Sequence, residues 1–173
     1  SELRLASWTP RNGPILASDW RDVVQAATGT GTVARLYKGG YWSVARRIVS
    51  ESETAIQAFV VSAGLGLRAF DELAPSYAAT FSPGHDDSVP GAESVAGRRA
   101  WWRALGGTEA FRTRLCDAST PGPFVICVPN RYLDVIVPDL VELQSVVGRE
   151  RVLLFTTQTD GLGVLEPSVV RLD

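Results

Sequence analysis

The 173-residue sequence contains no methionine, one histidine, one lysine and two cysteines. Cys116 lies in an expected helix and Cys127 in an expected strand, so we interpret both as buried apolar side chains rather than as a disulfide or a reactive thiol. With one histidine and no Cys-x-x-Cys motif, we predict no zinc site, and we predict no cofactor. Because the chain begins at Ser1 without a methionine, we expect its native start to be absent through processing, trimming or a cloning remnant.

Long apolar runs and an excess of positive charge are also absent. No run approaches the roughly 20 apolar residues of a membrane-spanning helix. The formal net charge of -2 excludes the global basic field that is typical of nucleic-acid-binding proteins. We therefore expect a cytoplasmic protein with no membrane partner. All but one of its 17 basic residues are arginines, which either genomic base composition or an array of guanidinium groups for phosphates explains.

The hydrophobic content of 45% suits one domain with a substantial core, so we predict a single α/β domain over residues 1–173. Residues 1–33 are expected to form an irregular arm with one short helix. Apolar runs bounded by turn residues predict strands at 56–62, 124–128 and 152–156, and 164–172 is a candidate for a final edge strand, with an antiparallel orientation as one option. Apolar residues at helical spacing predict helices over 20–27, 41–51, 95–105, 109–117 and 131–147.

Strand, helix and strand over 124–156 imply a right-handed parallel crossover. The fold class that we predict is a three-layer Rossmann-like α/β sandwich with a mostly parallel central sheet. Such sheets usually start on a strand and none is visible at the beginning of this chain, so we expect that the native first strand is missing or is supplied differently.

Residues 58–88 contain the best candidates for a site. The run 56–62 reads as a central strand buried on both faces, and Gly64 and Gly66 then allow the backbone to approach a ligand closely. Carboxyl ends of parallel strands meet at one rim of a sheet, so the polar residues that follow the three core strands should cluster there. They are Ser62, Asn130, Tyr132, Thr156 and Thr157. The Ser62 hydroxyl either binds a ligand or caps the glycine turn by accepting from a backbone N–H.

Three residues of this region are catalytic candidates: Ser62, Asp71 and His85. Asp86 or Asp87 could orient the His85 ring and raise its pKa toward neutrality, as a general base requires. An exposed loop histidine beside two aspartates is the alternative. No Gly-x-Ser-x-Gly elbow supports a serine nucleophile.

Two further groups are candidate ligand contacts. Tyr37, Lys38, Tyr41 and Trp42 lie at the start of the 41–51 helix, where unpaired N–H groups favour anions; aromatic packing under a loop is the alternative. Five arginines are candidates for a patch that binds phosphate or nucleic acid, the alternative being a solvated helix face. They are Arg98, Arg99, Arg103, Arg112 and Arg114.

Five segments carry a resemblance to known proteins: LYKG at 36–39, YW at 41–42, VVSAGLGL at 60–67, DELAPSY at 71–77 and ATFS at 79–82. Together they resemble a set of uncharacterised bacterial α/β proteins and, more distantly, the YaaA-type peroxide-stress proteins. The YaaA-type pattern has a serine, then Tyr-Gly-Leu, then an acidic residue and Pro-x-Tyr; here Leu65 replaces the usual aromatic residue and Tyr77 ends the motif. The resemblance implies association with DNA protection, nucleobase modification or phage defence.

The residues and the resemblance together predict a domain that binds or processes a nucleotide, a nucleobase or DNA. Tyr77 joins the expected ligand contacts through the resemblance. If the protein is an enzyme, we expect a hydrolase or glycosidase that acts on a nucleotide-like substrate. One alternative is a small-molecule hydrolase that uses His85 with Asp86 or Asp87. Another is a non-catalytic interaction module in which Trp8, Trp20 and the N-terminal arm cover a protein partner.

Overall fold

The structure is a computed structural model that describes residues 2–7, 16–117, 119–157 and 161–170. It is a mixed α/β protein built from helices and several small sheets, in the order β1 (Leu3–Arg4), α1 (Ala17–Ala26), β2 (Gly31–Thr32), α2 (Val33–Leu36), α3 (Gly40–Glu51), β3 (Phe59–Ser62), β4 (Gly66–Ala69), β5 (Leu73–Ala74), β6 (Tyr77–Ala78), α4 (Val95–Ala104), α5 (Gly107–Leu115), β7 (Phe124–Cys127), α6 (Asn130–Val147), β8 (Val152–Phe155) and β9 (Val169–Val170). Short 3-10 helices at Leu5–Ser7, Arg149–Arg151 and Gly163–Ser168 complete it. None of the helices in the described part of the chain combines the length and apolar character that a bilayer crossing requires.

The C-terminal third follows the predicted strand, helix and strand. β7 and β8 pair in parallel with Phe124 opposite Val152, and α6 connects them. α6 buries Leu133, Ile136 and Leu140 at helical spacing, which is why its periodicity is readable from the sequence. β9 adds to β8 in parallel, so the antiparallel orientation considered for the last strand is wrong.

The region around the glycine turn differs from the prediction. β3 pairs with β4 in an antiparallel hairpin whose last pair is Ser62 and Gly66, with residues 63–65 as its tip. The run 56–62 is therefore one arm of a hairpin and has no parallel neighbour among the described strands. The segment after this hairpin contains β5, which pairs antiparallel with β2, and β6, which pairs in parallel with β1.

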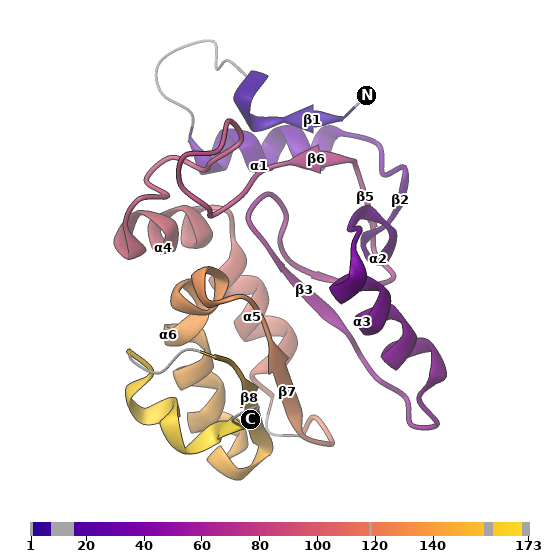
Figure 1. The fold of residues 1–173 in the computed structure, drawn as a ribbon, viewed down its shortest axis with the longest axis vertical. Helices are drawn as coiled ribbons and strands as arrows, with labels where there is room; N and C mark the ends of the chain where they lie inside the picture. The colour runs from indigo at the N-terminus through magenta and orange to yellow at the C-terminus, as the bar shows by residue number, and fades with distance from the viewer. Residues whose placement is uncertain (1, 8–15, 118, 158–160, 171–173) are drawn as a thin grey trace.

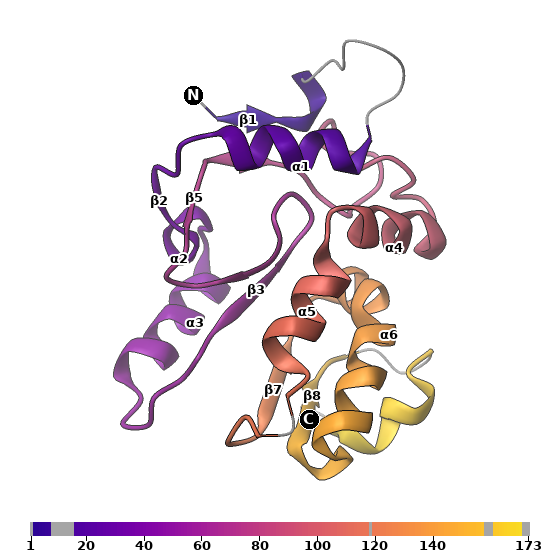
Figure 2. The ribbon, with the colours of Figure 1, turned by 180° about the vertical axis from the view of Figure 1, so that it is seen from behind.

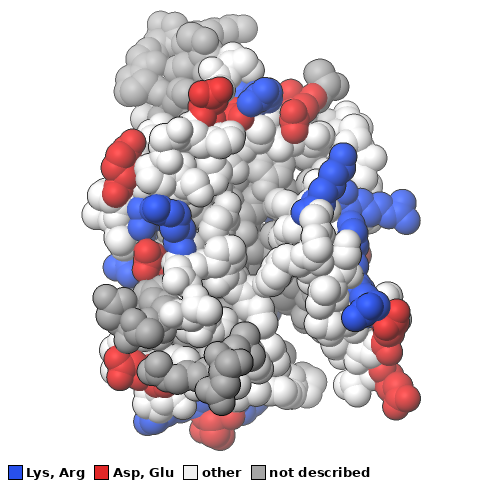
Figure 3. Space-filling view, in the orientation of Figure 1, with Lys and Arg blue, Asp and Glu red and all other residues white. Residues whose placement is uncertain are grey.

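The elements form two flanks with a hollow between them. α2, α3 and β3 lie on one flank, while α4, α5, α6, β7 and β8 lie on the other, and α1 with β1 crosses one end (Figures 1 and 2). The space-filling view shows the hollow as an opening between the flanks (Figure 3). Part of the core lies under α1 and α4, where Trp20 and Trp102 are fully enclosed. Trp20 is thus a core residue and is not available to cover a protein partner, while Trp8 falls outside the described residues.

Candidate functional site

A chain of three hydroxyl groups forms the centre of the candidate site. The Ser62 hydroxyl at the end of β3 lies 2.6 Å from the Tyr77 hydroxyl of β6, and the Tyr77 hydroxyl lies 2.5 Å from the Tyr37 hydroxyl. Three segments that are far apart in the sequence therefore converge on one polar line. Ser62 is buried, while Tyr37 and Tyr77 are each partly exposed.

The hydrogen atoms of this chain can be assigned by counting acceptors. Ser62 Oγ accepts the backbone N–H of Gly64 at 3.2 Å and that of Leu65 at 2.9 Å, which uses both of its lone pairs. Its own hydrogen is therefore donated to Tyr77. The Tyr37 hydroxyl interacts with the Ser62 hydroxyl as well as with that of Tyr77, so the three hydroxyl groups form one connected cluster.

Burial raises the pKa values of these phenols. The pKa of Tyr77 lies well above its ordinary value and that of Tyr37 is raised too, in both cases chiefly because burial disfavours the phenolate. Both hydroxyls therefore stay protonated at neutral pH and act as hydrogen-bond donors. The occupied lone pairs of Ser62 likewise favour its role as a cap of the turn over a role as nucleophile.

Aromatic rings line the outer side of the hydroxyl chain. Tyr37 stacks on Trp42, with ring centroids 4.4 Å apart and an interplanar angle of 16°. The Tyr41 ring stands edge-on to Trp42 at 5.9 Å, and the Trp42 ring lies 6.1 Å from Phe70. The predicted group at the start of α3 thus holds its aromatic members in one cluster, with Tyr41 exposed at its edge.

The carboxyl end of β7 completes this region. The Tyr41 hydroxyl donates to the Cys127 carbonyl oxygen at 2.6 Å, so its side chain reaches from α3 to the end of β7. Tyr132, on the first turn of α6, packs edge-on against Phe81 at 5.0 Å. It is also near enough to Tyr37 and Tyr77 to contribute to the rise of their pKa values. All four tyrosines of the chain therefore gather here, and we call Tyr37, Tyr41, Tyr77 and Tyr132 with Trp42 the tyrosine site.

The hairpin tip is held against the tyrosine site by two indoles. Trp20 Nε1 donates to the Gly64 carbonyl at 2.9 Å, and Trp101 Nε1 donates to the Ala63 carbonyl at 2.8 Å. A Cβ atom on Gly64 would lie 2.4 Å from two ring carbons of Tyr77, so glycine is what allows the ring and the tip to touch. Gly66 has a φ of 73°, which suits the turn into β4. The glycines are visible in the sequence, but the two tryptophans that fix their carbonyls cannot be recognised from it.

Two predicted rim residues, Asn130 and Thr156, also come together. Thr156 Oγ1 donates to Asn130 Oδ1 at 3.3 Å, which joins the ends of β7 and β8 as the parallel crossover predicts. Lys38 is exposed directly after Tyr37. It belongs to a basic stretch, because residues 33–51 contain four arginines and lysines and one glutamate. The flank that holds α2 and α3 accordingly shows basic side chains beside the hollow (Figure 3).

Asp71 lies away from the tyrosine site. It is an exposed residue of the turn between β4 and β5, at the opposite end of the hairpin from Ser62. β4 runs from Gly66 to Ala69, a length of roughly 10 Å, and Asp71 lies in the turn beyond its far end. The structure therefore does not bring Asp71 and Ser62 into one catalytic group.

His85 is exposed, and none of the carboxylates in the described part of the chain forms a hydrogen bond with its ring. Its Nδ1 accepts the backbone N–H of Asp87 at 3.2 Å, while the Asp87 carboxylate binds Arg4 at 2.5 Å and the Ala6 N–H at 3.0 Å. The hydrogen bond from Arg4 lowers the pKa of Asp87. Asp87 thus fastens β1 to the loop, and Asp86 is exposed. The dyad on which the hydrolase alternative depends is not formed.

Carboxylates and carbonyls hold four of the five arginines of the predicted phosphate patch. Arg98 is buried, binds Asp134 at 3.2 Å and donates to the Ala92 carbonyl, and Arg99 donates to the Asp134 carbonyl. Arg114 pairs with Glu72. These contacts leave little positive charge for phosphates.

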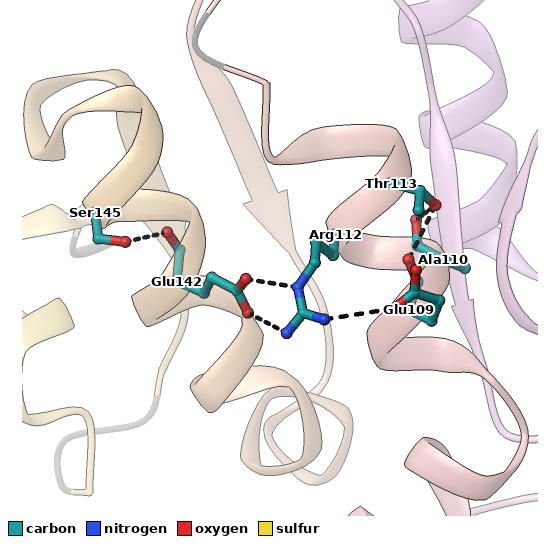
Figure 4. Close-up of polar contacts among 6 residues, drawn as sticks. All are labelled: Glu109, Ala110, Arg112, Thr113, Glu142 and Ser145. Atoms are coloured by element: carbon teal, nitrogen blue, oxygen red, sulfur yellow. Dashed lines mark hydrogen bonds and ion pairs between the residues drawn. The ribbon is translucent and has the colours of Figure 1, made fainter.

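Arg112 shows the same behaviour at the interface of α5 and α6. Its Nε and Nη2 atoms donate to the two carboxylate oxygens of Glu142 at 2.7 and 3.2 Å, and Glu109 approaches from its other side (Figure 4). Arg103 is exposed, with no ion-pair partner in the described part of the chain, and it borders a cavity of about 140 Å³ between α4 and α6. Asp139 and Glu142 line that cavity together with Arg99 and Arg103, so its lining carries both signs of charge.

Among the described residues, no three or more histidine, cysteine, aspartate or glutamate side chains are grouped as a metal site requires. In comparisons with protein-family models, with curated proteins and with solved structures, no significant match to this chain was found.

Proposed function

We propose that the tyrosine site binds a nucleobase, a nucleoside or a nucleotide. The observation that carries this proposal is the hydroxyl chain of Ser62, Tyr77 and Tyr37, which lies directly beside the Tyr37–Trp42 ring stack. Nucleobases present carbonyl and ring-nitrogen acceptors on flat rings. A donor held beside stacked aromatic rings suits such a ligand, because base stacking on aromatic side chains stabilises binding by about 1–3 kcal/mol per base.

The charge around the site supports a phosphorylated form of this ligand. Lys38 and Arg35 are within two residues of Tyr37 in the sequence, are exposed and have no ion-pair partner among the described residues, whereas Arg47 is paired with Glu51. Two unpaired cations next to an aromatic cluster favour a nucleotide over a free base. The resemblance of the 36–42, 60–67 and 71–77 segments to YaaA-type proteins supports the same ligand class. DNA remains within the proposal through a single-stranded or unstacked base.

The proposal also includes the expected cellular location and fold class of the protein. We expect the protein to act in the cytoplasm, and the parallel pairing of β7, β8 and β9, with α6 connecting β7 to β8, supports the expected Rossmann-like fold class. The proposal concerns binding, since the donors of the site are protonated phenols rather than groups that activate water.

Titration of the 173-residue chain with a panel of bases, nucleosides, nucleoside monophosphates and short single-stranded DNA tests the proposal. Tryptophan fluorescence reports binding because Trp42 is part of the site. Replacing Tyr37 with phenylalanine keeps the stack and removes a hydroxyl, so affinity should fall by about tenfold, as expected for a lost hydrogen bond of about 1.4 kcal/mol. Ser50→Ala, which removes an exposed hydroxyl of α3 outside the tyrosine site, is the control and should bind as the parent does.

Lys38→Ala distinguishes recognition of the phosphate from recognition of the base. This variant should bind nucleoside monophosphates more weakly than the parent does and should bind nucleosides equally well. The affinity of the parent for nucleotides should decrease as the salt concentration rises. If no member of the panel binds at low salt, or if Tyr37→Phe binds as tightly as Ser50→Ala, the site has another function.

A further inference from the structure

Two edge strands of this protein have a free edge that faces the hollow. β7 is the outermost strand of the β7-β8-β9 sheet, and β3 pairs with β4 alone among the described strands. In Figures 1 and 2, β3 and β7 run in the same direction on the two sides of the hollow, and Figure 3 shows that side chains do not fill it. Open strand edges present rows of unpaired N–H and C=O groups, which proteins ordinarily cover or protect.

The register identifies which backbone groups of β3 face the opening. The Phe70 N–H donates to the Ala58 carbonyl at 3.0 Å, so residues 58, 60 and 62 direct their peptide groups toward β4. The intervening residues Phe59 and Val61 direct theirs to the other side. No described residue accepts from or donates to these groups.

One hydrogen bond gives the same information for β7. The Tyr41 hydroxyl comes from the α3 side of the hollow and donates to the Cys127 carbonyl at 2.6 Å, so the Cys127 peptide groups point toward the opening. Because strands alternate with a period of two, Val125 presents its N–H and C=O on that side too. Each open edge therefore belongs to a four-residue strand and has no strand partner among the described residues.

Apolar side chains are exposed along the hollow as well. α3 has no buried residue along its length. Tyr41, Val44 and Ile48 are 56%, 48% and 57% exposed, and their spacing of three and four residues places them on the face from which Tyr41 reaches β7. On β7, Val125 is 58% exposed. A helix that leaves an apolar stripe uncovered beside two open strand edges lacks its normal packing partner.

We propose that a β-strand from a partner polypeptide inserts between β3 and β7. An extended peptide is the one ligand class that offers donors and acceptors along both of its edges at strand spacing, and strand addition is an established mode of peptide recognition. The inserted strand joins β4, β3, β7, β8 and β9 into one continuous sheet, with α3 packed on its face. Alternating β-branched residues fit the apolar stripe, and acidic residues at the ends complement Lys38 and Arg35.

The test uses a nine-residue peptide of alternating valine and threonine with a glutamate at each end, added to the 173-residue chain. Amide hydrogen exchange is followed residue by residue. Exchange at Phe59, Val61, Val125 and Cys127 should slow by about tenfold or more at saturation, as expected when an exposed N–H gains a strand partner. Exchange at Val60, which already faces β4, should not change. A peptide with proline at its centre should give no effect.

A pair of variants tests the edge itself. Val125→Pro removes the N–H on the open side and leaves the groups that face β8, so the chain should stay folded and lose the peptide. Val125→Thr keeps that N–H and should bind it. Absence of protection at saturating peptide, or equal binding by the proline variant, overturns the proposal. If the four amides are already protected in a dimer that the peptide does not dissociate, the occupant is a second copy of this chain and a partner strand is ruled out.

Discussion

Replacing Gly64 with alanine should destabilise the protein through a steric clash within the candidate site. The added Cβ lies 2.4 Å from Tyr77 Cδ2 and Cε2, whereas carbon atoms in contact are ordinarily about 3.5–4.0 Å apart. The backbone of Gly64 has no positive φ, so alanine meets no conformational penalty there and the effect is one of overlap alone. Either the tip or the Tyr77 ring must therefore move by about an ångström.

Neither of them moves without losing hydrogen bonds. The tip is fixed by Trp20 at the Gly64 carbonyl and by Trp101 at the Ala63 carbonyl, and the Tyr77 ring is fixed by the hydroxyl of Ser62. Overpacking a rigid core costs about 1–3 kcal/mol. Loss of one of these hydrogen bonds adds about 1 kcal/mol. We expect the free energy of unfolding to fall by about 2–4 kcal/mol.

Urea unfolding followed by circular dichroism measures this change, with Gly40→Ala as the matched control. Gly40 begins α3, no atom lies within 4 Å of the position that its Cβ would take, and alanine should be neutral or stabilising by up to about 1 kcal/mol there. Truncating Tyr77 to alanine in the Gly64→Ala background removes the obstacle, so the double variant should lose less stability than the sum of the two single variants. An unfolding midpoint for Gly64→Ala equal to that of Gly40→Ala would refute the close contact between the tip and the ring.

Two other groups give predictions of the same kind. Arg4 lowers the pKa of Asp87, so the stabilisation from Asp87 is fully present above about pH 4 and is lost as the pH falls through the lowered pKa. The difference in unfolding free energy between the parent and Asp87→Asn should therefore shrink on acidification. A constant difference from about pH 7 to about pH 2.5 would contradict this prediction. Arg98→Ala removes a buried guanidinium from a pair with the partly exposed Asp134 and should destabilise the protein clearly, whereas Arg112→Ala removes an exposed pair and should have a much smaller effect. Thermal or urea unfolding distinguishes them, and loss of nucleic-acid binding in folded Arg112→Ala would restore the phosphate patch.

The helices and the C-terminal strands are predictable because local periodicity determines them. The spacing of Leu133, Ile136, Leu140 and Leu143 indicates one buried face whatever surrounds it, and α6 follows that spacing. The run that ends at Ser62 reads as a central parallel strand, because a short apolar run does not distinguish such a strand from a buried hairpin arm. The hairpin depends on the tip meeting Trp20 and Trp101, and no local pattern contains that information.

The site is predictable in part for the same reason. Helix-start chemistry and a resemblance point to Tyr37, Tyr41 and Tyr77, and the structure brings them together. Asp71 and His85 are candidates only through their chemical types within one stretch of chain. Asp71 lies only five residues from Gly66 in the sequence, but an extended strand converts those five residues into the length of the hairpin. The type of a residue suggests which chemistry it can perform. Where its side chain lies in the fold depends on strand pairing between segments that are far apart in the sequence.

Tyr41 connects the two proposals physically. Its ring stands against Trp42, which stacks on Tyr37 at the ligand site, and its hydroxyl occupies the Cys127 carbonyl at the open edge of β7. A strand added to β7 competes for that same carbonyl, so it must release the Tyr41 hydroxyl and with it the restraint on the aromatic cluster. Binding at the two places is then coupled, and by thermodynamic reciprocity each ligand changes the affinity of the other by the same factor. Tyr41→Phe removes the competing hydroxyl, so it should strengthen strand addition while leaving the hydroxyl chain of Ser62, Tyr77 and Tyr37 unaltered.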